Sequence, residues 1–227
     1  MRIVVAVLAW LAISGSASAL GLEDLSNKDA VSGLKDALTQ GSTAAIGKLG
    51  VTDGFLGNER VKIPLPDALR RVESGLRLIG MQSQADELVV AMNRAAEQAV
   101  PEAKSLLVGA IKNMSVKDAK GILTGGDTAA TEYFRRTTSS QLTAKFLPIV
   151  TKATSKVGLA QKYDAIASQG AHLGLVDAKQ AKIEDYVTQK ALDGLFLMMA
   201  DEEKAIRKDP VGAATGLARK VFGLLGK

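Results

Sequence analysis

Tyr186–Arg207, YVTQKALDGLFLMMADEEKAIR, is the stretch around which the rest of the chain is expected to fold. Within it, Ala191–Ala200 contains only two residues without an apolar side chain, Asp193 and Gly194. A helix that is apolar on all sides is buried, and a run this short cannot cross a bilayer, which takes about 20 residues. The stretch therefore predicts a central apolar helix, at about 185–207, in an all-α protein.

The C-terminal end of this helix carries charges of both signs. Glu203 and Arg207 are spaced i, i+4, which favours an ion pair on a helix surface. We therefore expect this end to be solvated. Asp209-Pro210 is expected to end the helix, because the residue before proline is disfavoured in the α conformation.

The composition indicates helices elsewhere too. The chain has 227 residues, of which 47% are hydrophobic but only 4% aromatic. Small aliphatic side chains must therefore fill the core, which suits close-packed helices. Few runs alternate as strands do. The expected fold is an irregular multi-helix domain of about eight to ten helices, formed by a single domain over residues 20–227.

The N-terminus predicts export. Arg2 is followed by the uncharged apolar run Ile3–Ile13, and Ala17–Ala19 has the A-x-A pattern of a cleavage site. Residues 1–19 are therefore interpreted as a signal peptide. The alternative is an uncleaved anchor, but the apolar run is short for a membrane span of about 20 residues.

The absence of cysteine and the small net charge exclude several classes of site and make nucleic-acid binding unexpected. Without cysteine there are no disulfides, no thiolate metal sites and no lipid-modified N-terminal cysteine. The formal charge is +5 with basic residues scattered among acids, so nucleic-acid binding is not expected. With no transmembrane segment after the signal, the chain is expected to be a soluble periplasmic protein of a bacterium.

Other helices follow from apolar spacing and capping residues. The pattern predicts helices over about 28–48, 66–79, 83–99, 101–114, 115–124, 127–136, 139–157, 159–167 and 210–225. Pro101 either begins a new helix or kinks the one before it. Ser115 and Asp118 resemble a capping box, Asp127 is a candidate cap, and Pro148 should kink its helix. Gly50–Pro66 is the longest non-helical segment expected there. It is either a surface connection or a functional loop.

No recognised catalytic or cofactor motif is present. His172, the only histidine, lies in the Gly- and Ala-rich connection Gln169–Lys182 and is interpreted as an exposed loop residue. The chain lacks H-E-x-x-H, G-x-S-x-G, Walker-type and G-x-G-x-x-G motifs, so no cofactor is expected. Asp53 is a candidate cation ligand, although a turn aspartate is the preferred interpretation.

Six polar residues in otherwise apolar or glycine-rich surroundings are candidates for a binding site: Asn93, Arg94, Asp127, Tyr133, Arg135 and Asp193. They form either an internal polar network or a shared site in a cleft. Asp193 is expected to be a buried structural charge paired with Arg94. Removing one member of such a pair costs about 3–5 kcal/mol.

Several segments together resemble the bacterial domain-of-unknown-function family 4197. They are Thr52–Leu56 (TDGFL), Lys62–Pro66 (KIPLP), Met92–Glu97 (MNRAAE), Val100–Ala103 (VPEA), Gly125–Asp127 with Tyr133–Arg135 (GGD, YFR), Lys145–Val150 (KFLPIV) and Tyr186–Phe196 (YVTQKALDGLF). The resemblance covers roughly Leu25 to Phe222 and departs in Gln169–Lys182. It implies an exported helical protein of Gram-negative bacteria with no assigned activity.

Three functions remain open at this stage. The preferred one is non-catalytic, through binding or envelope organisation, with an envelope protein or an apolar ligand as partner. The second is a carrier of an apolar ligand or lipid, because Met92, Met198 and Met199 adapt to varied shapes. The third is an enzyme that uses a carboxylate pair. An apolar cavity of roughly 300 Å³ would favour the carrier, and a polar cleft holding Asp193 would favour the enzyme.

Mass spectrometry of protein recovered from the periplasm tests the export signal. We expect a mature N-terminus at Leu20, because cleavage follows the small residue at Ala19. An intact Met1 in the membrane fraction would contradict the signal-peptide interpretation.

Overall fold

The computed structural model describes residues 27–71, 82–158, 160–164 and 182–209, with Gly216, Arg219 and Val221. All regular structure in these ranges is helical, so the predicted all-α class is confirmed. The elements are α1 (Asn27–Leu49), α2 (Asp67–Arg71), α4 (Gln82–Ala99), a 3-10 turn (Val100–Glu102), α5 (Ala103–Lys112), α6 (Val116–Leu123), α7 (Ala129–Thr154) and α9 (Ile183–Lys208).

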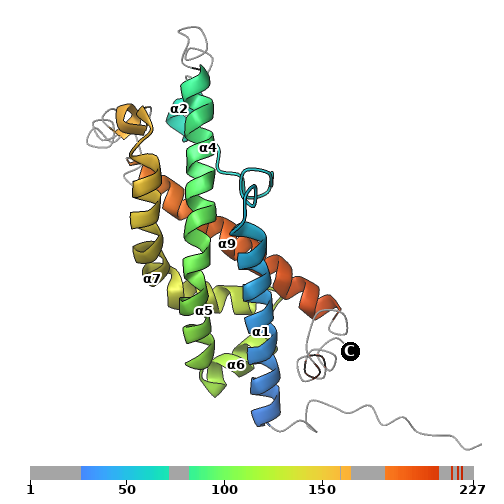
Figure 1. The fold of residues 1–227 in the computed structure, drawn as a ribbon. Helices are drawn as coiled ribbons and strands as arrows, with labels where there is room; N and C mark the ends of the chain where they lie inside the picture. The colour runs from blue at the N-terminus through green and yellow to red at the C-terminus, as the bar shows by residue number, and fades with distance from the viewer. Residues whose placement is uncertain are drawn as a thin grey trace, which may run out of the picture.

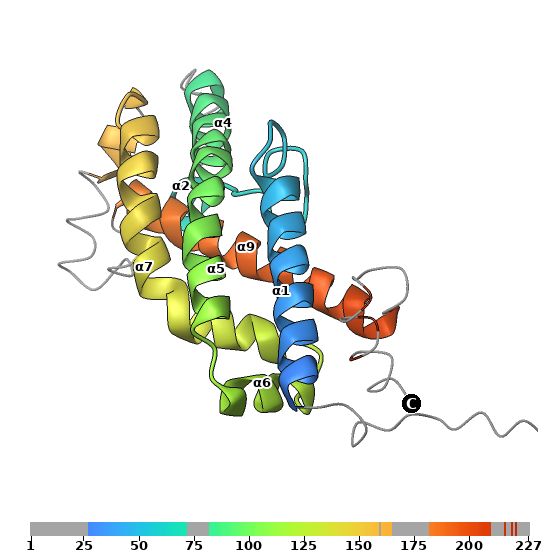
Figure 2. The same ribbon diagram turned by 60° about the horizontal axis from the view of Figure 1, so that its bottom comes forward.

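The helices form a layer with one helix crossing it. In Figures 1 and 2, α1, the α4–α5 rod and the C-terminal half of α7 run side by side, and α9 crosses all three. Helix α5 continues the line of α4 beyond the 3-10 turn at Pro101. Helix α6 covers the end of the layer away from the C-terminal half of α7.

Helix α7 replaces two helices expected from the sequence. It continues without interruption through 137–139 and past Pro148, and it bends strongly along its length (Figures 1 and 2). The hydroxyls of Thr137, Thr138 and Ser139 donate to the carbonyls four residues earlier, at 2.8, 2.7 and 2.6 Å. Such bonds bend helices, and proline removes a helical N–H.

The expected count of eight to ten helices is not confirmed. The helices predicted over 127–136 and 139–157 have merged into α7. Most of the helix predicted over 66–79, and most of that predicted over 210–225, lies outside the described residues, as do the signal peptide and the connection with His172. Of the helix predicted over 159–167, residues 160–164 are described and helical. Among the helices that the structure describes, none is both long and apolar enough to cross a membrane.

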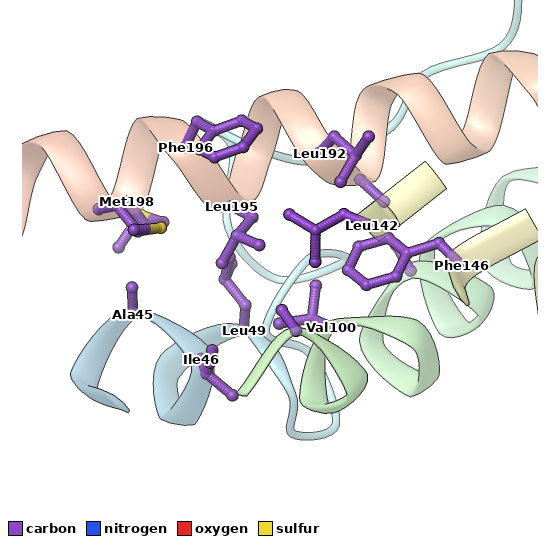
Figure 3. Close-up of a cluster of buried hydrophobic side chains, with 14 of the residues drawn as sticks. Ala45, Ile46, Leu49, Val100, Leu142, Phe146, Leu192, Leu195, Phe196 and Met198 are labelled. Carbon is purple, nitrogen blue, oxygen red and sulfur yellow. The ribbon is translucent and has the colours of Figure 1, made fainter. Parts of the chain in front are cut away.

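The inner face of α9 forms the centre of the core. Figure 3 shows Leu195 of α9 pointing toward Leu49 of α1, with Leu142 and Phe146 of α7 beside them. Leu195, Leu142 and Phe146 have no exposed surface, and Leu49 retains 1%. Burying one such side chain contributes roughly 1.5–3 kcal/mol, so this crossing is a major source of stability.

The outer face of α9 is only partly covered, so the expectation of a central helix apolar on all sides is not confirmed. Leu197 is 37% exposed, and the Asp193 side chain 45%. The turn-rich segment after α1 covers another part of this face, where the Phe55 ring lies directly over Gly194. The apolar stretch of α9 thus has one surface against α1 and α7, one surface against the loop at Gly194, and one outer stripe, with Asp193 and Leu197, that is partly exposed.

The predicted non-helical segment Gly50–Pro66 is confirmed, and it packs across α9. Val61, Ile63 and Leu65 are buried in turn. The Tyr186 hydroxyl donates to the Pro64 carbonyl at 3.0 Å, and burial raises the pKa of Tyr186 to about 12. The segment is therefore part of the core rather than only a surface connection.

One helix cap agrees with its sequence signal. The Ser115 hydroxyl accepts from the Asp118 N–H at 3.1 Å, and the Asp118 carboxylate accepts from the Ser115 N–H at 3.3 Å. The predicted capping box at the start of α6 is confirmed. The hydrogen bond from the Ser115 hydroxyl is the main cause that lowers the pKa of Asp118.

Two glycine-to-alanine substitutions test the contact between α9 and Phe55. A Cβ on Gly194 would lie 2.7 Å from the Phe55 ring, whereas one on Gly109 of α5 would meet nothing within 4 Å. Gly109→Ala is expected to raise the free energy of unfolding by roughly 0.5–1 kcal/mol, because alanine is the better helix former.

Gly194→Ala has the same propensity gain but overpacks the core, which typically costs about 1–3 kcal/mol. Urea unfolding should therefore rank Gly194→Ala below Gly109→Ala by that amount. Equal stabilisation by both substitutions would show that the Phe55 ring can move away from the new methyl group without loss of stability.

Candidate functional site

Asn93 of α4 fixes the extended part of the Gly50–Pro66 segment. Its side-chain oxygen accepts from the Ile63 N–H at 2.8 Å, and its amide donates to the Ile63 carbonyl at 2.9 Å and to the Val89 carbonyl at 2.8 Å. The side chain is completely buried. The Asn93 amide thus bonds both backbone groups of Ile63, as a neighbouring β-strand would do in a sheet.

Glu97, one turn further along α4, fixes the turn at Phe55 and Leu56, which precedes the extended part of the loop. Its Oε1 accepts from the N–H groups of Phe55 and Leu56 at 3.0 and 3.1 Å, and its Oε2 accepts from Arg94 at 2.7 Å. Arg94 also donates to Asp53 at 2.8 Å, and Asp53 has a positive φ of 65°. The bond with Glu97, followed by that with Asp53, raises the pKa of Arg94.

Asp193 lies in different surroundings from those predicted. Its carboxylate accepts from Gln189 at 3.0 Å and lies 3.7 Å from the Arg135 guanidinium, while Arg135 stacks 4.6 Å from the centre of the Phe196 ring. The side chains of Asp193 and Arg135 are 45% and 43% exposed. The predicted buried pair of Asp193 with Arg94 is therefore wrong, because Asp193 lies on the outer stripe of α9.

The remaining candidates have separate contacts. The Tyr133 hydroxyl donates to the Ala110 carbonyl at 2.9 Å, and Arg136 lies 5.7 Å from the centre of its ring. Asp127 is exposed, and the residue that caps α7 is Thr128, without a side-chain hydrogen bond. The structure thus brings Asn93 and Arg94 together on the loop, and Arg135 together with Asp193. Within the part of the chain that the structure describes, Tyr133 and Asp127 belong to neither group.

Glu203 performs the capping that was predicted for Asp127. Its carboxylate accepts from the N–H groups of Ala130 and Thr131, both at 2.9 Å, and from Arg207 at 2.8 Å. Arg207 also donates to the Ile122 carbonyl at 2.9 Å. The Glu203–Arg207 spacing was interpreted as a solvated pair, but the Glu203 side chain is only 5% exposed. A carboxylate here stabilises the N-terminus of α7.

A groove lies between α4 and the C-terminal half of α7, which run side by side in Figure 1. It has a volume of about 550 Å³ and is lined by Ala91, Arg94, Gln98, Pro148, Ile149, Lys152, Ala153 and Lys156. Three of these residues are cationic and none is acidic. Arg94 thus contacts the groove as well as the loop.

A charge pattern in the sequence accompanies this groove. The 31 residues from Tyr133 to Tyr163 include no Asp or Glu. Their basic residues are Arg135, Arg136, Lys145, Lys152, Lys156 and Lys162. The chain-wide balance of charges conceals this acid-free stretch, which forms most of α7.

Other candidate sites offer less. A pocket lined by residues of α1, α7 and α9 has a volume of about 20 Å³, close to that of one water molecule. Residues 27–71, 82–158, 160–164 and 182–209 contain no group of three His, Asp or Glu side chains placed to hold a metal ion. Asp53, the candidate cation ligand, is paired with Arg94.

Comparison with known proteins identifies one family. The sequence model of a family described as "Protein of unknown function (DUF4197)" matches residues 24–223, which confirms the resemblance. No curated protein and no solved structure matches the chain. Any functional conclusion therefore depends on the geometry of the chain itself.

Two carboxylate substitutions separate the exposed site from the buried one. Asp193→Ala should change the free energy of unfolding by only about 0–1 kcal/mol, as exposed ion pairs do. Glu97→Ala leaves the N–H groups of Phe55 and Leu56 without an acceptor, at roughly 1–3 kcal/mol for each orphaned donor. Thermal unfolding of both variants checks this, and a large loss in Asp193→Ala would contradict the exposed position.

Proposed function

The chain belongs to the DUF4197 family, whose function is unknown, and from that premise we propose that it acts by binding an anionic ligand. The ligand occupies the groove between α4 and α7. The protein works in the bacterial envelope, after export directed by residues 1–19. Binding, not catalysis, is the proposed activity.

The observation that carries this proposal is a groove that has two exposed lysines, Lys152 and Lys156, and no acid in its lining. Arg94 extends from α4, Lys152 from the last turn of α7, and Lys156 from the turn that follows it. Among the described residues, neither lysine forms an ion pair, whereas Arg94 forms two. Concave sites of about 300–1,000 Å³ with a few placed polar groups are typical ligand sites.

The two alternative functions find less support in the described residues. A carrier of an apolar ligand needs a large apolar cavity, and the pocket that α1, α7 and α9 line has a volume of only about 20 Å³. A carboxylate enzyme centred on Asp193 needs a second acid beside it in a cleft. Asp193 contacts Gln189 and Arg135 instead, and it does not line the groove.

The test is to identify small molecules that co-purify from the envelope of the native bacterium. We expect native mass spectrometry to detect a bound anion with the unmodified protein. Lys152→Glu with Lys156→Glu should remove it, since two attractive charges become repulsive. The matched control is Lys117→Glu with Lys120→Glu, which makes the same charge change on exposed residues of α6. Equal ligand content in all three proteins would overturn the proposal.

A further inference from the structure

The charges of the groove specify how much negative charge its ligand should carry. Arg94 is already paired with two carboxylates, Glu97 and Asp53, at 2.7 and 2.8 Å, so it offers a ligand no unmatched positive charge. Lys152 and Lys156 are both exposed, and the described residues supply them with no acidic partner. The lining therefore has two positive charges to be matched, which favours a ligand of charge close to −2.

The spacing of the two lysines favours a compact anion. Lys152 lies in the last turn of α7, and Lys156 is the second residue after the helix ends at Thr154. Both side chains line the same groove, so the two flexible ammonium groups can converge on one ligand group. A phosphate monoester carries about −1.5 to −2 at pH 7 on three oxygens, whereas a carboxylate carries only −1.

The rest of the lining is apolar. Ala91 of α4 and Ile149 and Ala153 of α7 are partly buried and pack against the core. Pro148 has no free N–H and adds another apolar surface. Gln98, at the α4 wall, offers one amide. A free inorganic ion would leave this floor in contact with water, so the ligand should also have an apolar part.

We infer that the ligand is a phosphate monoester with a short apolar body, which is held by Lys152 and Lys156 over the floor formed by Ala91, Ile149 and Ala153. The inference rests on the proposed function and adds the chemical class of its ligand. A soluble phosphomonoester and the headgroup of a membrane lipid such as phosphatidic acid share this chemistry.

Isothermal titration calorimetry on the mature chain compares three probes: hexyl phosphate, inorganic phosphate and heptanoate. Hexyl phosphate should bind about tenfold more tightly than heptanoate, because its second charge meets the second ammonium. Its affinity should also exceed that of inorganic phosphate by about tenfold. Burial of about two methylene groups is enough for this gain.

Variants connect the binding to the groove. Lys152→Gln with Lys156→Gln should weaken hexyl phosphate binding by about tenfold or more, and binding should fall steeply with salt. Lys117→Gln with Lys120→Gln on α6 should bind as the parent does. If Lys152 only complements the C-terminal dipole of α7, the groove variant will melt earlier without losing affinity, and the inference fails.

A vesicle experiment separates the two sources of phosphate. Co-sedimentation with phosphatidylcholine vesicles that contain phosphatidic acid, but not with pure phosphatidylcholine, identifies the lipid headgroup. Hexyl phosphate binding without co-sedimentation identifies a soluble phosphomonoester. Either result supports the inference.

Failure of the inference is distinguishable from failure of the proposed function. If heptanoate binds as tightly as hexyl phosphate, or no probe binds, the phosphate class is wrong. A groove-dependent ligand recovered from the envelope would still uphold the binding function in that case. If the envelope preparations also show no groove-dependent ligand, both proposals are wrong.

Discussion

The crossing of α9 over α1, α4 and α7 is the contact on which the rest of the structure depends. Leu195 and its neighbours bury one face of α9 against all three helices (Figure 3). The low aromatic content makes this possible, because small side chains allow helices to approach closely. Gly194 extends the same principle to the opposite face, where the Phe55 ring occupies the space that a Cβ would need.

The packing removes some backbone N–H groups from water, and two buried glutamates accept hydrogen bonds from them. Glu97 accepts from the turn at Phe55, and Glu203 accepts from the first turn of α7. Each is paired with an arginine of its own helix, Arg94 or Arg207. A buried carboxylate without such partners would be costly, so each pair stabilises a junction between non-helical and helical structure.

The groove follows from the same arrangement. The bend in α7 brings its C-terminal half alongside α4 (Figures 1 and 2), and no larger side chain from either helix fills the space over Ala91 and Ala153. Arg94 connects the two regions, since it holds Glu97 and Asp53 while it contributes to the groove wall. Arg94 therefore links the loop to the wall of the groove.

The sequence alone determined the features that depend on local spacing and composition: the all-α class, the position of α9 within about two residues, the non-helical segment Gly50–Pro66 and the capping box at Ser115. These follow from periodicity and from turn and cap residues, which act over a few positions. Tertiary structure decided which polar residues meet. Asp193 and Glu203 occur on one helix, yet the first is exposed and the second buried, because burial depends on which face the other helices cover. Ion pairs across the chain, such as Arg94 with Asp53, and the groove between α4 and α7 arise only when distant segments pack together.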